Sequence, residues 1–147
     1  MGDGEPDHAA LLRFRTALRQ FNRWSEDEAA AVGLTHIQHQ LLLAIKGHED
    51  PRGPTISDAA DYLLVRHHSV VELVNRTEVL GFVERHQDET DGRVIRLHLT
   101  ALGETSITAL TELHVRELKA LTPLLALVTA PQRAGNGPSD GDGRTSA

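Results

Sequence analysis

Apolar residues recur at alternating spacings of three and four in several stretches of the chain, which is the pattern of amphipathic helices. The spacing predicts a first helix over residues 7–32, ended by Gly33. A second helix is predicted from Thr35 to Gly47, because Thr35 and Gln38 have the spacing of a capping box. The apolar face of the first helix holds Leu11, Phe14, Leu18 and Phe21, and that of the second holds Ile37, Leu41, Ala44 and Ile45.

Two shorter helices are predicted in the middle of the chain. Ser57 is a good N-cap for a third helix that runs to about residue 64. A fourth helix covers residues 67–80 and ends at Gly81. The third helix is expected to face inward through Ala60, Leu63 and Leu64, and the fourth through Val70, Leu73, Val74 and Thr77. The opposite, polar stripe of the fourth helix consists of His68, Ser69, Glu72, Asn75 and Arg76.

After Gly81 the hydrophobic period shortens to two, which is typical of strands. The segments FVERHQ and VIRLHL, separated by the turn residues DETDG, predict a two-stranded hairpin. Thr55 and Ile56 are expected to form a very short strand. Thr100 is a candidate cap for a last long helix, and Thr122-Pro123 predicts a break where Thr122 caps a short final helix.

The order of these elements predicts a mainly α fold, a winged helix-turn-helix with a hairpin wing and an additional helix at each end. We expect one domain over residues 7–130, with the winged core at 35–99 and the outer helices at 7–33 and 100–130. Residues 1–6 and 131–147 are expected to be disordered tails. The outer helices carry apolar faces too broad for a small winged domain to cover, so we expect them to be the dimerisation helices of a homodimer. The alternative is that they fold back on their own domain.

Composition restricts the class of protein further. The chain has no cysteine, only 3% aromatic residues and a net charge of −6. It has no secretory signal pattern and no apolar run of the roughly 18 residues that a membrane span needs. We therefore expect a cytoplasmic protein without membrane attachment and without a cofactor. A glycine-rich phosphate loop, a nucleophile elbow and a paired-carboxylate signature are all missing from the sequence, so an enzyme is not expected.

The hairpin region and the helix before it carry a family resemblance. The segment VERHQDETDGRVIRLHLTALG contains Asp91-Gly92-Arg93 at the predicted turn and then Leu99-Thr100-Ala101-Leu102-Gly103. The segment before it, SVVELVNRTEVLGFVER, passes from a helix through a glycine into the first strand. In this order and spacing, residues 34–103 resemble the MarR (multiple antibiotic resistance regulator) family, a family of winged helix-turn-helix transcriptional regulators.

The resemblance implies a dimeric, sequence-specific regulator of double-stranded DNA, expected to be a repressor released by a small-molecule effector at a pseudo-palindromic operator. It places the helix from His67 in the major groove and Arg93 in the flanking minor groove, as the chemistry of both grooves allows. Asp91 is expected to hold the Arg93 guanidinium or the wing turn, and a plain turn aspartate is the alternative. The expected DNA-binding residues are Arg66, His67, His68, Ser69, Glu72, Asn75, Arg76, Asp91 and Arg93.

Three positions depart from the family pattern. Leu64 stands where the turn before the recognition helix usually has a glycine, and Arg66 replaces the usual serine or aspartate cap. Glu72 stands where a basic or small polar residue is common. A carboxylate there repels phosphate, although it can accept a hydrogen bond from cytosine N4. Together with the net charge of −6, Glu72 favours the alternative of a winged-helix module that binds protein.

The family resemblance also implies an effector pocket between the dimerisation helices and the winged unit, for a small aromatic acid or phenol. The candidate lining residues are Arg13, Trp24, His39 and Asp61. A further alternative is a zinc-sensing regulator of the same fold, because His36 and His39 lie one helical turn apart and His114 with Glu117 lies on the final helix. No tight cluster of metal ligands is present in the sequence, so we do not expect a metal site.

Overall fold

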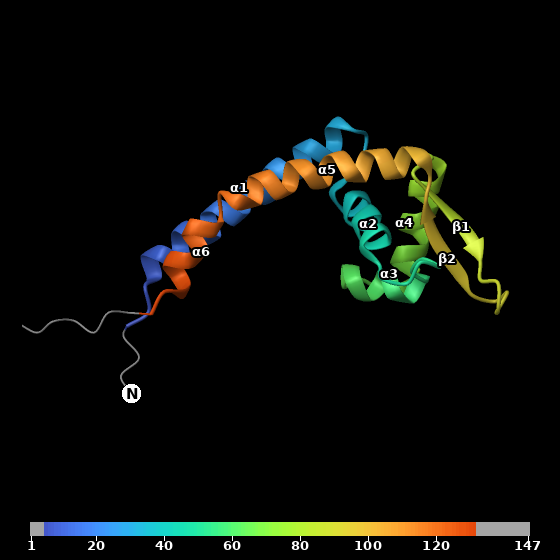
Figure 1. Cartoon of the computed structure of the whole chain (residues 1–147), viewed down its shortest axis with the longest axis horizontal. Coiled ribbons are helices and arrows are strands. Elements are labelled where there is room, and N and C mark those ends of the chain that lie inside the picture. The colour runs from blue at the N-terminus through green and yellow to red at the C-terminus, as the bar shows by residue number, and fades with distance from the viewer. Residues whose placement is uncertain (1–4, 132–147) are drawn as a thin grey trace, which may run out of the picture.

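The computed structural model describes residues 5–131 and confirms the mainly helical winged fold (Figure 1). Its elements, in chain order, are α1 (His8–Ala31), α2 (His36–Gly47), α3 (Ile56–Leu63), α4 (His67–Val79), β1 (Val83–Gln87), β2 (Ile95–Leu99), α5 (Ala101–Lys119) and α6 (Thr122–Thr129). The predicted disordered tails fall largely on residues 1–4 and 132–147, which lie outside the described residues. In the described part, no helix is both long and apolar enough to cross a membrane.

The chain divides in space into a long arm and a winged unit (Figure 1). Helices α1, α5 and α6 run side by side in the arm, while α2, α3, α4 and the hairpin gather at one end of it. Helix α1 begins where the Asp7 carboxylate accepts a hydrogen bond from the backbone N–H of Ala10, at 2.9 Å. It ends before Gly33, whose φ of 84° breaks the helical path. Both ends agree with the prediction from the sequence.

The caps of α2 and α3 are capping boxes, in which a threonine and a side chain three residues later bond each other's backbone N–H groups. Thr35 and Gln38 form the predicted box of α2. The prediction that Ser57 caps α3 is wrong, because Thr55 and Asp58 form a second box and start the helix two residues earlier. The expected tiny strand is present only as one isolated bridge between Thr55 and Arg96.

Leu64 corrects a second prediction. It was expected to face inward, yet it is 90% exposed and has a φ of 55°. The reason is that Leu64 is the C-cap of α3, where the chain reverses in the left-handed conformation to enter α4. Glycine is the residue that adopts this conformation without a steric cost, so Leu64 is both strained and exposed.

One aliphatic core joins the winged unit to the root of the arm. Its largest fully buried side chains include Leu41, Leu42, Val70, Leu97, Ile107 and Leu110. The four apolar positions predicted for α4 are all buried, whereas on α2 Ile37 is exposed and Leu42 is buried instead. Burial of several aliphatic side chains from five elements fixes α4 and the wing relative to the arm.

The predicted hairpin is present, and its strands pair antiparallel from Val83 opposite Leu99 to Gln87 opposite Ile95. Thr100 then caps α5 by accepting a hydrogen bond from the backbone N–H of Gly103, at 3.1 Å. Gly103 is buried against the backbone of Phe82, and a Cβ there would overlap the Phe82 carbonyl oxygen. At the far end of the arm, Leu121 occupies the cap position of α6 without a side-chain bond, so the prediction that Thr122 is the cap is wrong by one residue.

Candidate nucleic-acid interface and adjoining cavity

The outward face of α4 is polar. Because the four apolar positions of this helix are buried, the residues between them are turned to the surface. Ser69 is half-buried at the edge of the face, and the other members of the predicted stripe are exposed, namely His68, Glu72, Asn75 and Arg76. Such a face offers hydrogen-bond donors and acceptors of the kinds that read base edges in a major groove.

The start of α4 has no side-chain cap. Arg66 occupies the cap position, but only its backbone carbonyl takes part, accepting from Ser69 N–H at 3.0 Å and Val70 N–H at 3.2 Å. His67 and His68 follow in the first turn and are exposed. The positive end of the helix dipole therefore lies at the surface beside a guanidinium, which is a favourable environment for a phosphate oxygen.

Arg85 of β1 connects α4 to the wing. Its guanidinium bonds the Glu78 carboxylate at 2.8 Å and also donates to the side-chain oxygen of Asn75. The Asn75 oxygen is thus engaged within the protein, and its NH2 group keeps its two donors. Arg85 could not be identified from the sequence, because its bonds join β1 to α4 and the hydrophobic period within each element does not specify how the two lie relative to each other.

An exposed arginine, Arg93, lies at the tip of the wing and is oriented by Asp91. The Asp91 carboxylate accepts from the Arg93 backbone N–H at 3.1 Å and from Arg93 Nε at 3.2 Å, with Nη2 at 3.4 Å. Asp91 therefore contacts both the turn and the guanidinium, the two roles that the sequence left as possibilities. The Arg93 side chain is 92% exposed, so the pair adds little stability but limits the directions in which the guanidinium points.

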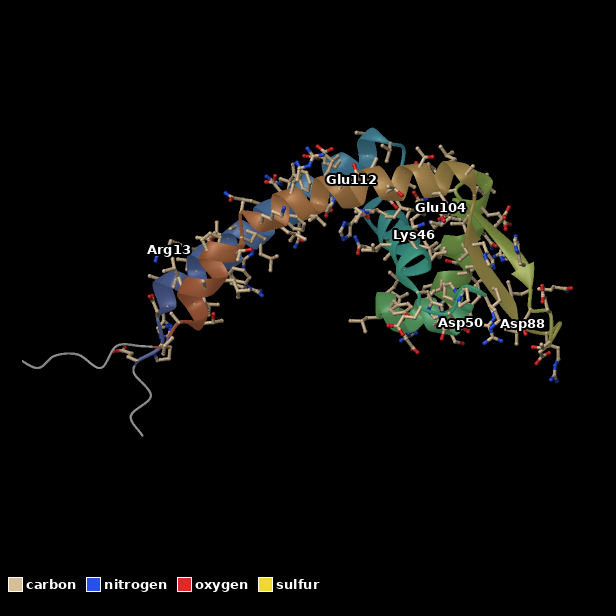
Figure 2. The ribbon with its side chains drawn as sticks, viewed as in Figure 1. Arg13, Lys46, Asp50, Asp88, Glu104 and Glu112 are labelled. Carbon is tan, nitrogen blue, oxygen red and sulfur yellow. The ribbon has the colours of Figure 1, made fainter. Side chains whose placement is uncertain are left out.

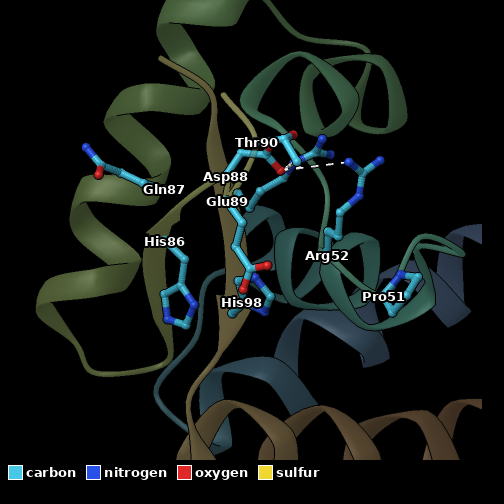
Figure 3. A pocket seen from close by; sticks show the side chains of 9 residues that line it. Pro51, Arg52, His86, Gln87, Asp88, Glu89, Thr90 and His98 are labelled. Atoms are coloured by element: carbon cyan, nitrogen blue, oxygen red, sulfur yellow. Dashed lines mark hydrogen bonds and ion pairs between the residues drawn. The ribbon is translucent and has the colours of Figure 1, made fainter. Parts of the chain in front are cut away.

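A buried carboxylate lies just after β1, where the turn of the wing begins (Figure 3). Asp88 accepts from the Thr90 hydroxyl at 2.7 Å, from Asp91 N–H at 3.1 Å and from Arg96 Nε at 3.2 Å. Arg96 also donates to the carbonyl oxygen of Gly53, at 3.2 Å. The bond from Thr90 is the main cause that lowers the pKa of Asp88 below its usual value, so the carboxylate is charged at neutral pH. The network ties the wing to the loop before α3.

That loop and the outer face of the wing enclose a hollow of about 360 Å³ (Figure 3). Arg52 forms one side and pairs with Asp50 at 2.7 Å, holding the pKa of Asp50 far below its usual range. His86 and His98 form the other side, with their rings stacked 4.3 Å apart between centroids. None of these residues was singled out from the sequence, because the loop and the strands are distant along the chain.

A second cavity, of about 390 Å³, lies where α1, α2 and α5 meet, between the arm and the winged unit. Its apolar wall comes from Phe21, Leu43, Val115 and Leu118, and its polar wall includes Ser25 and His114. Ser25 Oγ lies 2.7 Å from His114 Nε2, and His114 Nδ1 lies 2.6 Å from the Leu110 carbonyl oxygen. The cavity thus borders both the arm and the winged unit.

The predicted effector residues are only partly brought together. His39 lines the cavity, and Trp24 stands behind its wall, 4.8 Å from the His114 ring between centroids. Arg13 is exposed near the free end of the arm (Figure 2), and Asp61 is exposed on α3, and neither lines the cavity. The prediction of these two residues is wrong because each lies on a helix surface that turns away from the α1–α2–α5 junction.

The histidines considered for zinc do not form a metal centre. Among residues 5–131, no group of three or more His, Cys, Asp or Glu side chains is placed to hold a metal ion. Only 3% of His39 is exposed, and its ring packs 4.7 Å from that of His114, measured between centroids. His36 is exposed, so the two histidines one turn apart lie in different environments.

The sequence model of the MarR family matches residues 32–94, from the end of α1 to the wing tip. No curated protein sequence matches the chain. Among solved structures, MepR of Staphylococcus aureus is 21% identical, with a TM-score of 0.67 over 79% of this chain and 82% of that one. A MepR–DNA complex gives 22% identity and a TM-score of 0.65, over 81% of this chain and 85% of that one. MarR of E. coli is 19% identical, with a TM-score of 0.62 over 86% of this chain and 89% of that one.

The structural neighbours establish the fold, and the match to the winged core establishes the relationship. Members of this family are transcription regulators and not enzymes, which agrees with the expectation from the sequence. Two of the features that carried the resemblance, the helix at His67 and the Asp91–Arg93 turn, lie within the matched segment, and the third, residues 99–103, follows it. The chain is therefore similar to the MarR family over its winged core, residues 32–94, and has the fold of the solved structures of that family.

Proposed function

We propose that this protein is a homodimeric, sequence-specific double-stranded DNA-binding transcription regulator, acting as a repressor that a small-molecule effector releases. One observation carries the proposal: a single winged unit presents the exposed polar face of α4 and an exposed, held arginine at the wing tip. In this proposal residues 7–130 are one domain, in which 35–99 bind DNA while 7–33 and 100–130 dimerise. The similar MepR structure solved with DNA supports it.

The DNA contacts divide by chemistry. His68, Glu72, Asn75 and Arg76 face the major groove, where base edges differ, while Ser69 lies at the rim of this face. Arg66 and His67, at the uncapped start of α4, receive a phosphate. Arg93 enters the minor groove with Asp91 limiting its orientation, since a narrow minor groove attracts a guanidinium. Glu72 lowers general affinity for DNA and favours a cytosine opposite it.

The arm supplies the dimer interface. It exposes large apolar side chains that a lone chain leaves in water, namely Leu11, Leu12, Val115, Leu118, Leu125 and Leu127. An exposed apolar patch of this kind marks an interaction surface. A second copy is the occupant that fits, because a two-fold axis lets each arm cover the other with the same residues.

Charge along α1 supports the same arrangement. Arg13, Arg15 and Arg19 lie in its N-terminal, free half, and within residues 5–131 no ion pair involves them. The acidic run 26–28 follows in the last turns of α1, and Glu112 lies on α5 at the same end of the arm (Figure 2). If the two-fold axis is perpendicular to the arms, the two arms run antiparallel, and the basic end of one meets the acidic residues at the other end of its partner.

The cavity between α1, α2 and α5 is the proposed effector site. A molecule there touches the dimerisation helices and the first helix of the winged unit together. A ligand that favours one relative placement of these parts shifts the spacing of the two recognition helices and releases the operator.

Operator binding tests the proposal directly. Selection from a random duplex library should enrich a pseudo-palindrome with half-sites about one helical turn apart. By fluorescence anisotropy on that duplex, Arg93→Ala should weaken binding by about 1–3 kcal/mol. Lys46→Ala is the control, because it removes one positive charge from an exposed position on α2, outside the proposed DNA-binding and dimer surfaces. Failure to enrich any duplex, or equal losses for the two variants, would contradict the proposed DNA-binding role.

A further inference from the structure

Asn75 lies on the exposed polar face of α4, on the side next to β1. Its neighbours Val74 and Thr77 are fully buried, so the helix is fixed at this point and the Asn75 side chain starts from a defined position. The amide at the end of this side chain has one oxygen that accepts and one NH2 group that donates twice. Which of the two ends faces DNA determines what Asn75 reads.

Arg85 determines the orientation of this amide. A guanidinium only donates, so the Asn75 atom 2.5 Å from Arg85 Nη2 is the oxygen and not the nitrogen. A flipped amide would set its NH2 group against the guanidinium, two donors without an acceptor between them, and would lose a charge-assisted hydrogen bond. The bond therefore holds the oxygen toward the wing and turns the NH2 group away from it.

Arg85 is itself held by its surroundings. Its Nη1 donates to the Glu78 carboxylate over 2.8 Å, and Glu78 follows Asn75 by one helical turn, so the forked guanidinium meets two acceptors on one helix. In the hairpin, Arg85 stands opposite Leu97, which is fully buried. Only 26% of the Arg85 side chain is exposed, so water competes little for these bonds. The orientation of Asn75 is thus set by the docking of the wing on α4.

The orientation of the amide restricts the bases that Asn75 can read. Asparagine commonly reads adenine, because its oxygen accepts from N6 while its NH2 group donates to N7. Asn75 presents only donors, and the amino groups of adenine and cytosine would meet them donor against donor. Guanine offers two neighbouring acceptors, N7 and O6, whereas thymine offers only O4. The chemistry therefore favours guanine and disfavours adenine.

We infer that Asn75, positioned by Arg85, is a specificity-determining residue that selects a guanine in each half-site and rejects adenine. The inference rests on the proposed DNA-binding function and names a base that this face of α4 reads. Glu72, one helical turn earlier, is exposed and accepts where Asn75 donates. The two positions thus require opposite chemistry, a cytosine at Glu72 and a guanine at Asn75.

A base-by-base measurement tests the role of Asn75. The full-length protein is mixed with duplexes that carry each of the four base pairs in turn at every position of one half-site of its selected operator. Sequencing of the bound and free DNA then gives the relative affinities. The wild type should prefer guanine to adenine about tenfold at one position. Asn75→Ala should reduce this preference to less than about twofold and leave the preferences at the other positions in place.

Two variants of Arg85 test the positioning. Arg85→Met keeps the length of the side chain but removes its donors, so the amide can turn and accept from adenine N6. Adenine should then bind at least as tightly as guanine at the same position. Arg85→Lys retains a cationic donor and should retain the preference for guanine. Arg52→Met is the matched control, because it removes another carboxylate-paired arginine from outside the contact between α4 and the wing, and it should change no base preference.

The outcomes separate this inference from the proposed function. A loss of wing stability in Arg85→Met weakens binding to every duplex alike and cannot exchange guanine for adenine. A wild-type preference for adenine at the Asn75 position, or an Asn75→Ala protein that loses affinity equally for all duplexes, would overturn the inference and leave the DNA-binding role in place. A guanine preference retained in Arg85→Met would overturn the positioning by Arg85. Selection of no duplex by the wild type would remove the proposed function and this inference together.

Discussion

Replacing Gly103 by alanine should destabilise the protein even though alanine is the better helix former. Gly103 lies in the first turn of α5, where a Cβ would come well inside 3.0 Å of the Phe82 carbonyl oxygen. That oxygen also accepts from the Thr100 N–H at 3.1 Å, and the Gly103 N–H bonds the Thr100 hydroxyl. Relief of the overlap therefore requires movement of backbone that the wing and the α5 cap share.

The magnitude follows from three contributions. Forcing a methyl group into packed backbone costs about 1–3 kcal/mol, and weakening the Thr100 cap costs about 1 kcal/mol. The gain in helix propensity from glycine to alanine returns about 1 kcal/mol. The net loss in the free energy of unfolding should be about 2 kcal/mol.

Gly47→Ala is the matched control, because Gly47 is also helical and a Cβ there meets nothing within 4 Å. It should leave stability unchanged or raise it by about 0.5–1 kcal/mol. Urea unfolding followed by circular dichroism, at one protein concentration for all variants, measures both changes. A Gly103→Ala protein as stable as the wild type, or two variants shifted in the same direction, would refute the reasoning.

Three other outcomes are expected. Leu64→Gly should stabilise the protein by about 0.5–1 kcal/mol in the same urea assay. The substitution removes the strain of the left-handed conformation at φ 55°, and this gain exceeds the cost of the greater backbone entropy of glycine in the unfolded chain. A loss of stability would show that Leu64 makes a compensating contact. Arg19→Glu should weaken dimerisation, measured by analytical ultracentrifugation at low salt, far more than Arg76→Glu on the winged unit, and equal effects would argue against the antiparallel charge pairing. The folded-state pKa of His39, about 4, lies below its ordinary value of 6.5. As the pH falls, the unfolded chain therefore becomes protonated at His39 at a higher pH than the folded chain does. The contribution of His39 to stability is therefore complete above about pH 6.5 and is lost as the pH falls toward 4, and His39→Phe should flatten that part of the profile of urea midpoint against pH.

The sequence by itself determined the elements and most of their ends. Hydrophobic period distinguished the helices from the hairpin, since period is a property of neighbouring positions. The Thr35–Gln38 box, the Thr100 cap and the stop at Gly33 were all predicted correctly. Each depends on groups no more than a few residues apart, so the local sequence contains the whole interaction.

Competition between local signals was less predictable. Ser57 and Thr55 are both good caps, and the structure uses Thr55 because Asp58 returns the bond to its backbone. Leu64 follows an inward-facing pattern, but the reversal into α4 requires the left-handed conformation there and turns the side chain to solvent. In both cases two local rules applied and the path of the chain decided between them.

Which residues come together in the sites was decided largely by the tertiary structure. The exposed stripe of α4 and the Asp91–Arg93 turn could be predicted, because both lie within one element. The bonds of Asp88 to Arg96 and of Arg96 to Gly53, and the cavity that gathers Ser25, His39 and His114, join residues far apart in the chain. Arg13 and Asp61 were predicted for that cavity and lie elsewhere. Sequence period states which face of a helix a residue occupies, but only packing of the helices against one another decides which faces meet and which side chains lose their water.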